Sequence, residues 1–367
     1  MFWPAVVGAI AAFVLISRLV VADEAAPAPE KIAVDPTHCR PEATKPRAAI
    51  APQLVKFDVS PFPYSGDNPA DGKPFLDYDK NGQRGHISPR GSFHLEAEAY
   101  NDQRSLLYLP AGFDLSRPEQ ALIAVFFHGN FARLDRDVER RQRVPQQLAQ
   151  SGLNAALVAP QFAVDIADSS PGRFWENGVF KQYLAEAAKH LAELRGEPCT
   201  RAIFDRLGVV LVAYSGGYDP AAYALAVGGA DSRIRGVILL DALYGETDKF
   251  DKWIGSSVGA GGPAFFFSAY SDSSLAENMA LQRSLLAQHI KVDVSPHALQ
   301  LTQGSVTFLF AGPGIDHKGF VTSAWVRDPL EAALSAIVGF RTAPRPAQPV
   351  AARATKPIAR AVAGQPK

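Results

Sequence analysis

Short runs of almost uninterrupted apolar residues limit what the middle of this chain can fold into. A strand whose residues are all apolar must be covered on both faces, as parallel strands usually are. Stretches with helical spacing separate the runs, at 138–151, 180–194, 220–227, 275–288 and 329–340. This alternation predicts an α/β fold with a mostly parallel, eight-stranded, doubly wound sheet. The predicted strands lie at 93–100, 104–114, 121–130, 154–163, 208–217, 235–245, 263–272 and 306–314.

Polar residues follow several of these predicted strands. In open α/β sheets, ligands bind beyond the carboxyl ends of the strands, so these positions are candidates for chemistry. The residues concerned are His128, Gly129, Asn130, Ser215, Asp241, Asp272 and, shortly after the last strand, His317.

The turn at Ser215 joins a strand directly to a helix and reads Ala213-Tyr214-Ser215-Gly216-Gly217. It resembles the nucleophile elbow of the α/β-hydrolase superfamily, whose pattern is G-x-S-x-G, with Ala213 as a small departure. A serine on such a sharp turn needs small neighbours, because larger ones would clash with the adjacent strand and helix. The resemblance covers roughly residues 93–340. A phosphate-binding loop is disfavoured, because no Lys follows the glycines and G-x-G-x-x-G is absent.

The resemblance implies a catalytic triad in the chain order nucleophile, acid, histidine. Ser215 would be the nucleophile and His317 the general base. Asp272 is the preferred acid, because it follows the seventh predicted strand in a short polar loop that leads into a helix. Asp241, after the sixth predicted strand, is the alternative acid and lies in a more apolar context.

The resemblance also implies an oxyanion hole of backbone N–H groups, one from Gly216 and one from Asn130 or Phe131. His128 is expected to shape that loop rather than to react. No cofactor is expected. No metal site is expected either: residues 77–88 begin like an EF-hand loop but lack its twelfth-position Glu, so they are interpreted as a turn-rich surface segment.

These features together predict a serine hydrolase that cleaves carboxylic esters through an acyl-enzyme, acting on a small-molecule or polymer-end ester. The two longest insertions, 165–178 and 245–262, allow only a short cap. An acyltransferase or peptidase would use the same triad, and a catalytically inactive binding module is the alternative from another class. Aromatic residues near the expected rim favour an apolar pocket; they are Phe131, Phe162, Phe174, Trp175, Tyr218, Tyr244, Trp253 and Tyr270.

The ends of the chain differ from its middle. Residues 1–22 are apolar and end in a small-residue cleavage pattern, which predicts a signal peptide or an N-terminal anchor, and hence a periplasmic or secreted protein. A Pro/Ala-rich linker is expected at 23–50, the hydrolase domain at 51–340 and a basic disordered tail at 341–367. Weak envelope association through the termini is a further expectation.

Two further observations concern charge and cysteines. The formal net charge is zero, with 37 basic and 37 acidic residues, so no nucleic-acid partner is expected. The two cysteines, Cys39 and Cys199, could pair after export, but whether they come close enough is left open by the sequence.

Overall fold

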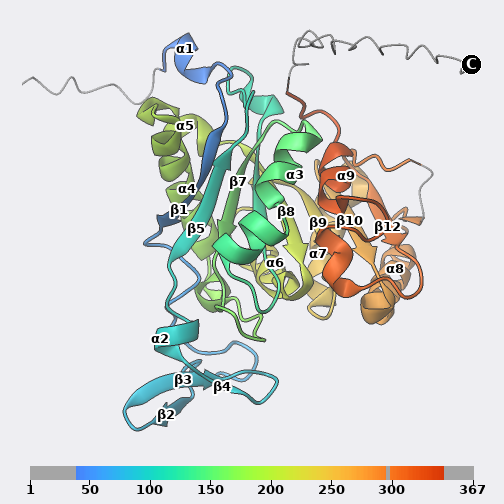
Figure 1. The fold of residues 1–367 in the computed structure, drawn as a ribbon. Coiled ribbons are helices and arrows are strands. Elements are labelled where there is room, and N and C mark those ends of the chain that lie inside the picture. The colour runs from blue at the N-terminus through green and yellow to red at the C-terminus, as the bar shows by residue number, and fades with distance from the viewer. Residues whose placement is uncertain (1–38, 295–297, 343–367) are drawn as a thin grey trace, which may run out of the picture. The chain divides into compact units, whose positions relative to one another are not determined.

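A computed structural model describes residues 39–294 and 298–342 and places a nine-stranded sheet at their centre (Figure 1). Strand β5 runs antiparallel to both of its neighbours, β1 and β7, and every other pair in this sheet is parallel. The predicted α/β class and mostly parallel sheet are therefore confirmed, with one strand more than expected. In spatial order the strands are β1 (Ile50–Lys56), β5 (Arg104–Leu109), β7 (Ala155–Pro160), β6 (Leu122–Phe127), β8 (Gly208–Tyr214), β9 (Ile234–Leu240), β10 (Phe265–Tyr270), β12 (Val306–Phe310) and β11 (Asp293–Val294).

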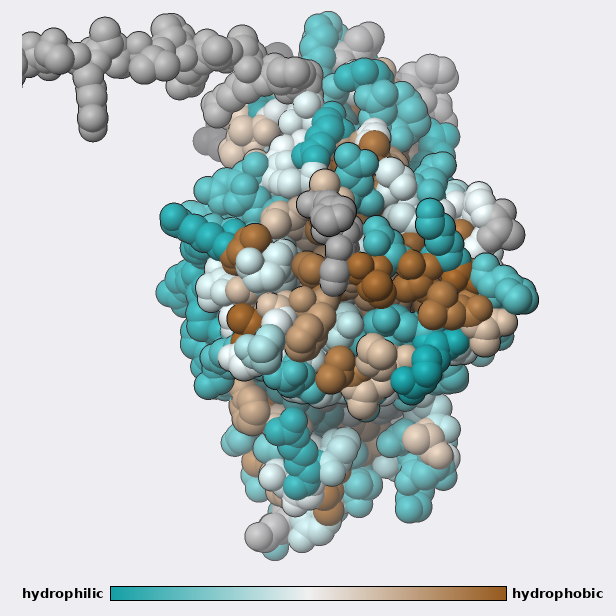
Figure 2. All heavy atoms as spheres, turned by 90° about the vertical axis from the view of Figure 1, so that its right-hand side faces the viewer, coloured by the Kyte–Doolittle hydropathy of each residue, from teal (hydrophilic) through white to brown (hydrophobic). Residues whose placement is uncertain are grey.

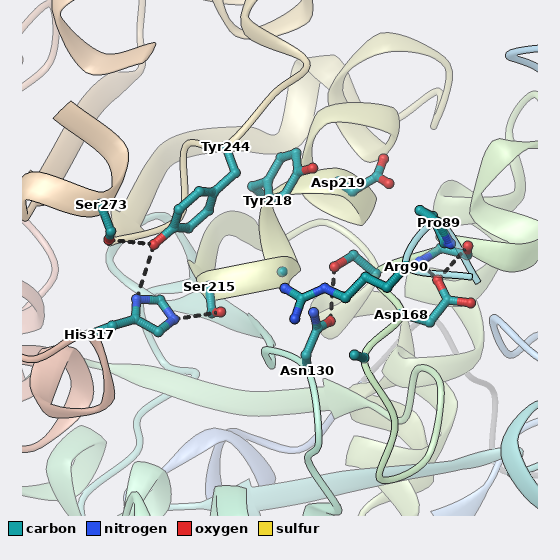
Figure 3. Close-up of a pocket in the computed structure, with 14 residues that line it drawn as sticks. Pro89, Arg90, Asn130, Asp168, Ser215, Tyr218, Asp219, Tyr244, Ser273 and His317 are labelled. Atoms are coloured by element: carbon teal, nitrogen blue, oxygen red, sulfur yellow. Dashed lines mark hydrogen bonds between the residues drawn. The ribbon is translucent and has the colours of Figure 1, made fainter. Parts of the chain in front are cut away.

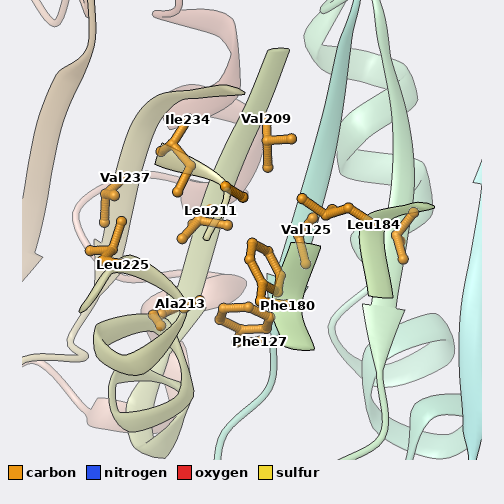
Figure 4. Packing of buried hydrophobic residues seen from close by; sticks show 14 of the residues in the cluster. Val125, Phe127, Phe180, Leu184, Val209, Leu211, Ala213, Leu225, Ile234 and Val237 are labelled. Carbon is orange, nitrogen blue, oxygen red and sulfur yellow. The ribbon is translucent and has the colours of Figure 1, made fainter. Parts of the chain in front are cut away.

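Helices cover both faces of this sheet, which explains why its central strands are apolar throughout. Alternate residues of β8 enter different cores: Val209 and Leu211 pack with α4, whereas Val210 and Val212 pack with α3 and α9. Figure 4 shows side chains of β6 and β8 meeting Phe180 of α4. The first face carries α4 (Val179–Arg195), α5 (Arg201–Phe204), α6 (Tyr218–Ala226), α7 (Thr247–Ser257) and α8 (Leu275–Ala287); the second carries α3 (Val144–Ser151) and α9 (Pro329–Ser335).

The helix predictions need two corrections. The segment predicted as one helix at 138–151 is divided into a π-helical stretch, η2 (Leu134–Arg141), and α3. Arg143, which stands between them, has a left-handed backbone with a φ of 53°, and this conformation ends the first segment. Helix α7 lies in a segment that was expected to be only a cap insertion.

A separate three-stranded sheet precedes the main one in the chain and consists of β2 (Tyr78–Lys80), β3 (Gln83–Ile87) and β4 (Phe93–Leu95). Asn81 and Gly82 connect β2 to β3 with φ values of 56° and 77°, as tight hairpins require. The EF-hand-like stretch at 77–88 is thus mostly this hairpin.

The prediction that residues 93–100 form a strand of the main sheet is wrong. Only β4 is extended, and the short helix α2 (Glu96–Ala99) follows it. The place in the main sheet belongs to β1, an edge strand that is only half-buried and contains Pro52. An edge strand tolerates proline because one side of it needs no ladder hydrogen bonds, so its sequence carries little strand signal.

The opposite edge of the main sheet ends in the two-residue strand β11. Viewed from that side, the surface has an apolar band among hydrophilic side chains (Figure 2). Helix α8 contributes exposed apolar side chains from Leu275, Met279 and Leu286. A very short edge strand offers few free backbone groups for pairing with another chain.

Residues 39–49 contact the body of the protein. Cys39 and Cys199 form a disulfide with their Cα atoms 5.3 Å apart, which answers the question that the sequence left open. The buried Arg195 of α4 donates hydrogen bonds to the carbonyl oxygens of Ala43 and Lys45, at 2.9 and 2.6 Å. The predicted signal segment and most of the predicted tail lie outside the described residues. Within the described ranges, no helix is long and apolar enough to cross a membrane.

Candidate active site

Ser215 sits at the turn where β8 ends and the 3₁₀ turn η5 (Ser215–Gly217) begins, directly before α6. Its φ of 54° is rare for a residue with a side chain and marks a strained turn. Close packing explains its small neighbours. A Cβ atom on Gly217 would lie 2.3 Å from the carbonyl oxygen of Phe127, and one on Gly129 would lie 2.6 Å from Cβ of Ser215. Ala213, the departure from the elbow pattern, is a fully buried β8 residue whose methyl group the core accommodates.

His317 connects Ser215 to an aspartate through both of its ring nitrogens, and Figure 3 shows the imidazole directed at Ser215. Its Nε2 lies 2.7 Å from Oγ of Ser215, and its Nδ1 lies 2.7 Å from Oδ2 of Asp241. His317 begins the short helix η9 (His317–Val321), which follows β12, and Asp241 directly follows β9. These three residues form one continuous hydrogen-bonded chain, although they come from three separate segments.

Two features define the fold: the order of Ser215, Asp241 and His317 along the chain, and the position of Ser215 at the end of a central strand. A serine on a strained strand-to-helix turn of a mostly parallel sheet precedes the acid, and the acid precedes the histidine. The described chain has the α/β-hydrolase fold. The hydrolase fold explains why Ser215 stands at the carboxyl end of a central strand, where a ligand can reach it.

Comparison with known proteins gives no sequence match: no family model and no curated protein matches this chain. Solved structures resemble it weakly. A feruloyl esterase module from Clostridium thermocellum is 15% identical with a TM-score of 0.40, covering 79% of this chain and 95% of its own. An S-formylglutathione hydrolase from Agrobacterium tumefaciens is 12% identical with a TM-score of 0.35, covering 65% and 90%. The fold assignment rests on the strand order and the elbow rather than on these likenesses.

Asp241 is buried and surrounded by hydrogen-bond donors. Besides His317, it accepts bonds of 2.5–3.0 Å from the hydroxyl groups of Ser271, Ser273 and Ser274 and from the backbone N–H of Ser271. Burial alone would raise the pKa of Asp241, but the bonds from His317, Ser274 and Ser271 outweigh burial and hold the pKa below its usual range. The carboxylate is therefore ionised at neutral pH and can stabilise a positively charged imidazole.

Asp272 does not contact His317, so the preference for it as the acid is corrected. Its side chain is exposed, and its Oδ2 accepts a hydrogen bond from the backbone of Gly314 at 3.1 Å. The cause is the pairing of β9 with β10: the backbone N–H of Asp241 donates to the carbonyl of Ala269, at 2.7 Å. This pairing places Ser271, Ser273 and Ser274, which flank Asp272, within hydrogen-bond distance of Asp241. The loop after β10 therefore supplies the donors, and the residue after β9 supplies the carboxylate.

Two tyrosines also contact His317, and neither contact was predicted from the sequence. The hydroxyl of Tyr244 lies 3.1 Å from Nδ1 of His317 and 2.8 Å from Oγ of Ser273. The ring of Tyr214 stacks on the imidazole with centroids 5.3 Å apart. Their places in the sequence, three residues after Asp241 and one before Ser215, are the signals that could have identified them.

The three expected oxyanion donors differ in whether their backbone N–H groups are free. The N–H of Phe131 already donates to the carbonyl of Ile166 at 2.8 Å, so the prediction of Phe131 as an oxyanion donor is wrong. Asn130 and Gly216 line the same pocket as Ser215. The backbone N–H of Asn130 has no hydrogen-bond partner in the described part of the chain. These two residues remain the predicted oxyanion donors.

His128 holds the loop that carries Asn130. Its Nδ1 donates to the carbonyl of Gly129 at 2.8 Å, and its Nε2 accepts from the backbone N–H of Phe162 at 2.9 Å. Burial lowers the pKa of His128 to about 4, so the ring is neutral and can accept at Nε2. It therefore occupies the loop-shaping position that the sequence analysis expected.

The pocket in front of Ser215 has a volume of about 500 Å³ and is lined mostly by residues with polar groups, with few of the expected aromatic residues among them. Of the eight aromatic residues expected at its rim, only Tyr218 and Tyr244 line it, whereas Phe162, Phe174 and Trp253 are buried in the core. Its walls are made by Pro89, Arg90, Asn130, Ala167, Asp168, Ser169, Ser170, Ser215, Gly216, Tyr218, Asp219, Tyr244, Ser273 and His317.

Proposed function

We propose that this protein is a serine hydrolase that cleaves carboxylic esters through an acyl-enzyme. The observation that carries the proposal is the continuous hydrogen-bonded chain from Ser215 through His317 to Asp241. A strained serine beside a histidine that is itself oriented by a buried carboxylate is the arrangement that activates a hydroxyl group as a nucleophile.

Each residue then has a defined role. Ser215 attacks the ester carbonyl while Nε2 of His317 takes its proton, and Asp241 stabilises the imidazolium through Nδ1. The N–H groups of Gly216 and Asn130 bind the oxyanion, each contributing ~3 kcal/mol to stabilisation of the transition state. His317 then protonates the departing alcohol, and a water molecule activated by the same histidine releases the acid.

The completeness of the group favours an enzyme over an inactive binding module. A binding module has no need for a strained serine at φ 54° or for a buried carboxylate aligned with the imidazole. The pocket of about 500 Å³ matches a small ester or the end of a polymer chain.

Labelling with a fluorophosphonate tests the nucleophile directly. The wild-type protein should be labelled covalently, and Ser215→Ala should not, while its melting temperature stays close to that of wild type. Ser256→Ala is the matched control: its hydroxyl bonds to Trp253 in α7, and it should label normally. Normal labelling of Ser215→Ala would place the nucleophile elsewhere. A series of p-nitrophenyl esters of graded chain length then defines the acyl group.

We also propose that the protein is exported. The Cys39–Cys199 disulfide supports this proposal, because such bonds persist in oxidising compartments. N-terminal sequencing of protein from the envelope fraction should begin at or near Asp23, and an intact Met1 in the cytosol would contradict export. Attraction of the basic tail to an anionic envelope surface stays a prediction, since residues 343–367 lie outside the described chain.

A further inference from the structure

The turn between β3 and β4 reaches into the catalytic pocket. Ser88 donates from its backbone to the carbonyl of Ser92 at 2.9 Å, and Gly91 donates to Ser88 at 2.7 Å with a φ of 78°. The tip of this tight turn holds Pro89 and Arg90, and both line the pocket with Ser215. The small sheet thus places one long cationic side chain beside the nucleophile.

Arg90 has no partner of its own. Within residues 39–294 and 298–342 its guanidinium forms neither an ion pair nor a hydrogen bond, whereas Arg84 on the same small sheet pairs with Glu96 at 3.1 Å. In Figure 3 the Arg90 side chain extends from the turn toward Ser215, with its guanidinium beside Asn130. A free guanidinium offers up to five N–H donors in a planar fork that matches a carboxylate.

Neither acidic residue that lines the pocket forms an ion pair with Arg90. Asp168 is buried, and its two oxygens accept bonds from Tyr100 and Ser170, at 2.6–2.8 Å. Asp219 has a buried Oδ1 that accepts no hydrogen bond from the residues that the structure describes. Burial raises the pKa of Asp219 to about 8, so this carboxyl is mostly protonated and neutral at pH 7.

The position of Arg90 relative to His317 decides which part of an ester it faces. His317 must protonate the leaving alcohol, so the alcohol part of the substrate lies on the His317 side of Ser215. Arg90 lies on the other side of Ser215, next to the oxyanion donor Asn130 (Figure 3). The acyl part of the substrate therefore points toward the guanidinium.

We propose that Arg90 binds a carboxylate on the acyl part of the substrate, so that the preferred substrates are half-esters of dicarboxylic acids. This inference rests on the proposed ester hydrolysis and adds the substrate class. In this role Arg90 determines specificity, while the bond-breaking chemistry stays with Ser215 and His317.

The test compares two esters of nearly equal size, ethyl hydrogen glutarate with a free carboxylate and ethyl glutaramate with a neutral amide. Wild type should hydrolyse the first with the higher kcat/KM. Arg90→Gln should lower kcat/KM for the half-ester roughly 10- to 100-fold, the range for a hydrogen bond to a charged group, and leave the amide ester within about twofold. The kcat/KM of Arg90→Lys for the half-ester should lie between those of wild type and Arg90→Gln, because lysine keeps the positive charge but lacks the planar fork of donors. Arg84→Gln, the matched control, should resemble wild type.

The outcomes separate this inference from the proposed function. Equal kcat/KM values of wild type for both esters would overturn the inference, as would an equal loss for both esters in Arg90→Gln, which would place Arg90 on the oxyanion. Fluorophosphonate labelling of Ser215 without half-ester hydrolysis would overturn the inference and leave the nucleophile in place. Absence of both labelling and hydrolysis would overturn the proposed function itself.

Discussion

Asp241 and Asp219 follow neighbouring strands of the same sheet, β9 and β8, yet their surroundings are opposite. Asp241 accepts hydrogen bonds from three serine hydroxyl groups, a backbone N–H and His317. Asp219, in the first turn of α6, has one buried oxygen for which the described part of the chain supplies no donor. Burial acts on both carboxyl groups in the same direction, but only in Asp241 do donors outweigh it, so the two pKa values move apart.

This difference shows how one active site can hold a charged and a neutral carboxyl group at the same pH. The charged group stands behind the imidazole, where a negative charge is useful. The neutral group lines the pocket, where a negative charge would attract Arg90 and repel a substrate carboxylate. The number of hydrogen-bond donors around each carboxyl group, rather than its depth of burial, determines whether it is charged.

The largest expected effect comes from removing the charge of Asp241. Asp241→Asn should lower kcat by ~10⁴-fold, because an amide holds His317 in the wrong tautomer, as in the analogous triad substitution. Asp272→Asn is the control: the exposed carboxylate of Asp272 accepts a bond from Gly314 and does not contact His317, so the kcat of this variant should stay within about twofold of wild type. Steady-state kinetics on one p-nitrophenyl ester measures both variants, and the reverse pattern would return the acid to Asp272.

Removing one donor from Asp241 should reduce stability. Ser274→Ala deletes a bond to Oδ1 and should lower the free energy of unfolding by about 1.5–3 kcal/mol, as expected for a bond to a charged group. A carboxyl group with a lowered pKa stabilises the fold above its unfolded pKa of ~4, and this contribution is lost as the pH falls. The loss in Ser274→Ala, measured by urea unfolding, should thus stay constant from pH 7 to about pH 5 and shrink as the pH falls further, through the lowered pKa of Asp241. A loss that does not shrink in acid would mean that the hydroxyl does not favour the ionised form.

Asp219 should show the opposite dependence on pH. Its pKa of about 8 in the folded protein exceeds the unfolded value of ~4, so wild type loses stability as the pH rises between these values. Asp219→Asn cannot ionise, so its melting temperature relative to wild type should rise by about 5 °C from pH 5 to pH 9. A constant difference across this range would show that Asp219 is not kept neutral by the fold.

The smallest effect is expected for the hydroxyl of Tyr244. It lies 3.1 Å from Nδ1 of His317 and 3.3 Å from Oδ2 of Asp241, and both contacts are longer than the His317–Asp241 bond of 2.7 Å. Tyr244→Phe should lower kcat by less than about fivefold, the value of one neutral hydrogen bond. A loss approaching that of Asp241→Asn would make Tyr244 a principal partner of the imidazole.

The sequence predicted the features that depend on local patterns and missed those that depend on pairing across the sheet. The elbow at Ser215 could be predicted because strand, turn and helix are contiguous, and His317 because it follows the last long strand. The choice between Asp241 and Asp272 could not, because the register of β9 against β10 decides which carboxyl group meets the imidazole. Arg90 was missed for a similar reason: a hairpin distant in the chain carries it to the pocket.

The disulfide between Cys39 and Cys199 has a mechanical consequence. The bond joins a point ahead of the edge strand β1 to the short 3₁₀ turn η4 (Pro198–Thr200) that links α4 to α5. If a force pulls on the chain before Cys39, the disulfide transmits part of that force to Cys199 and so to the helices α4 and α5. The disulfide thus shields the ladder between β1 and β5 from being unzipped one hydrogen bond at a time by a pull on the leading segment.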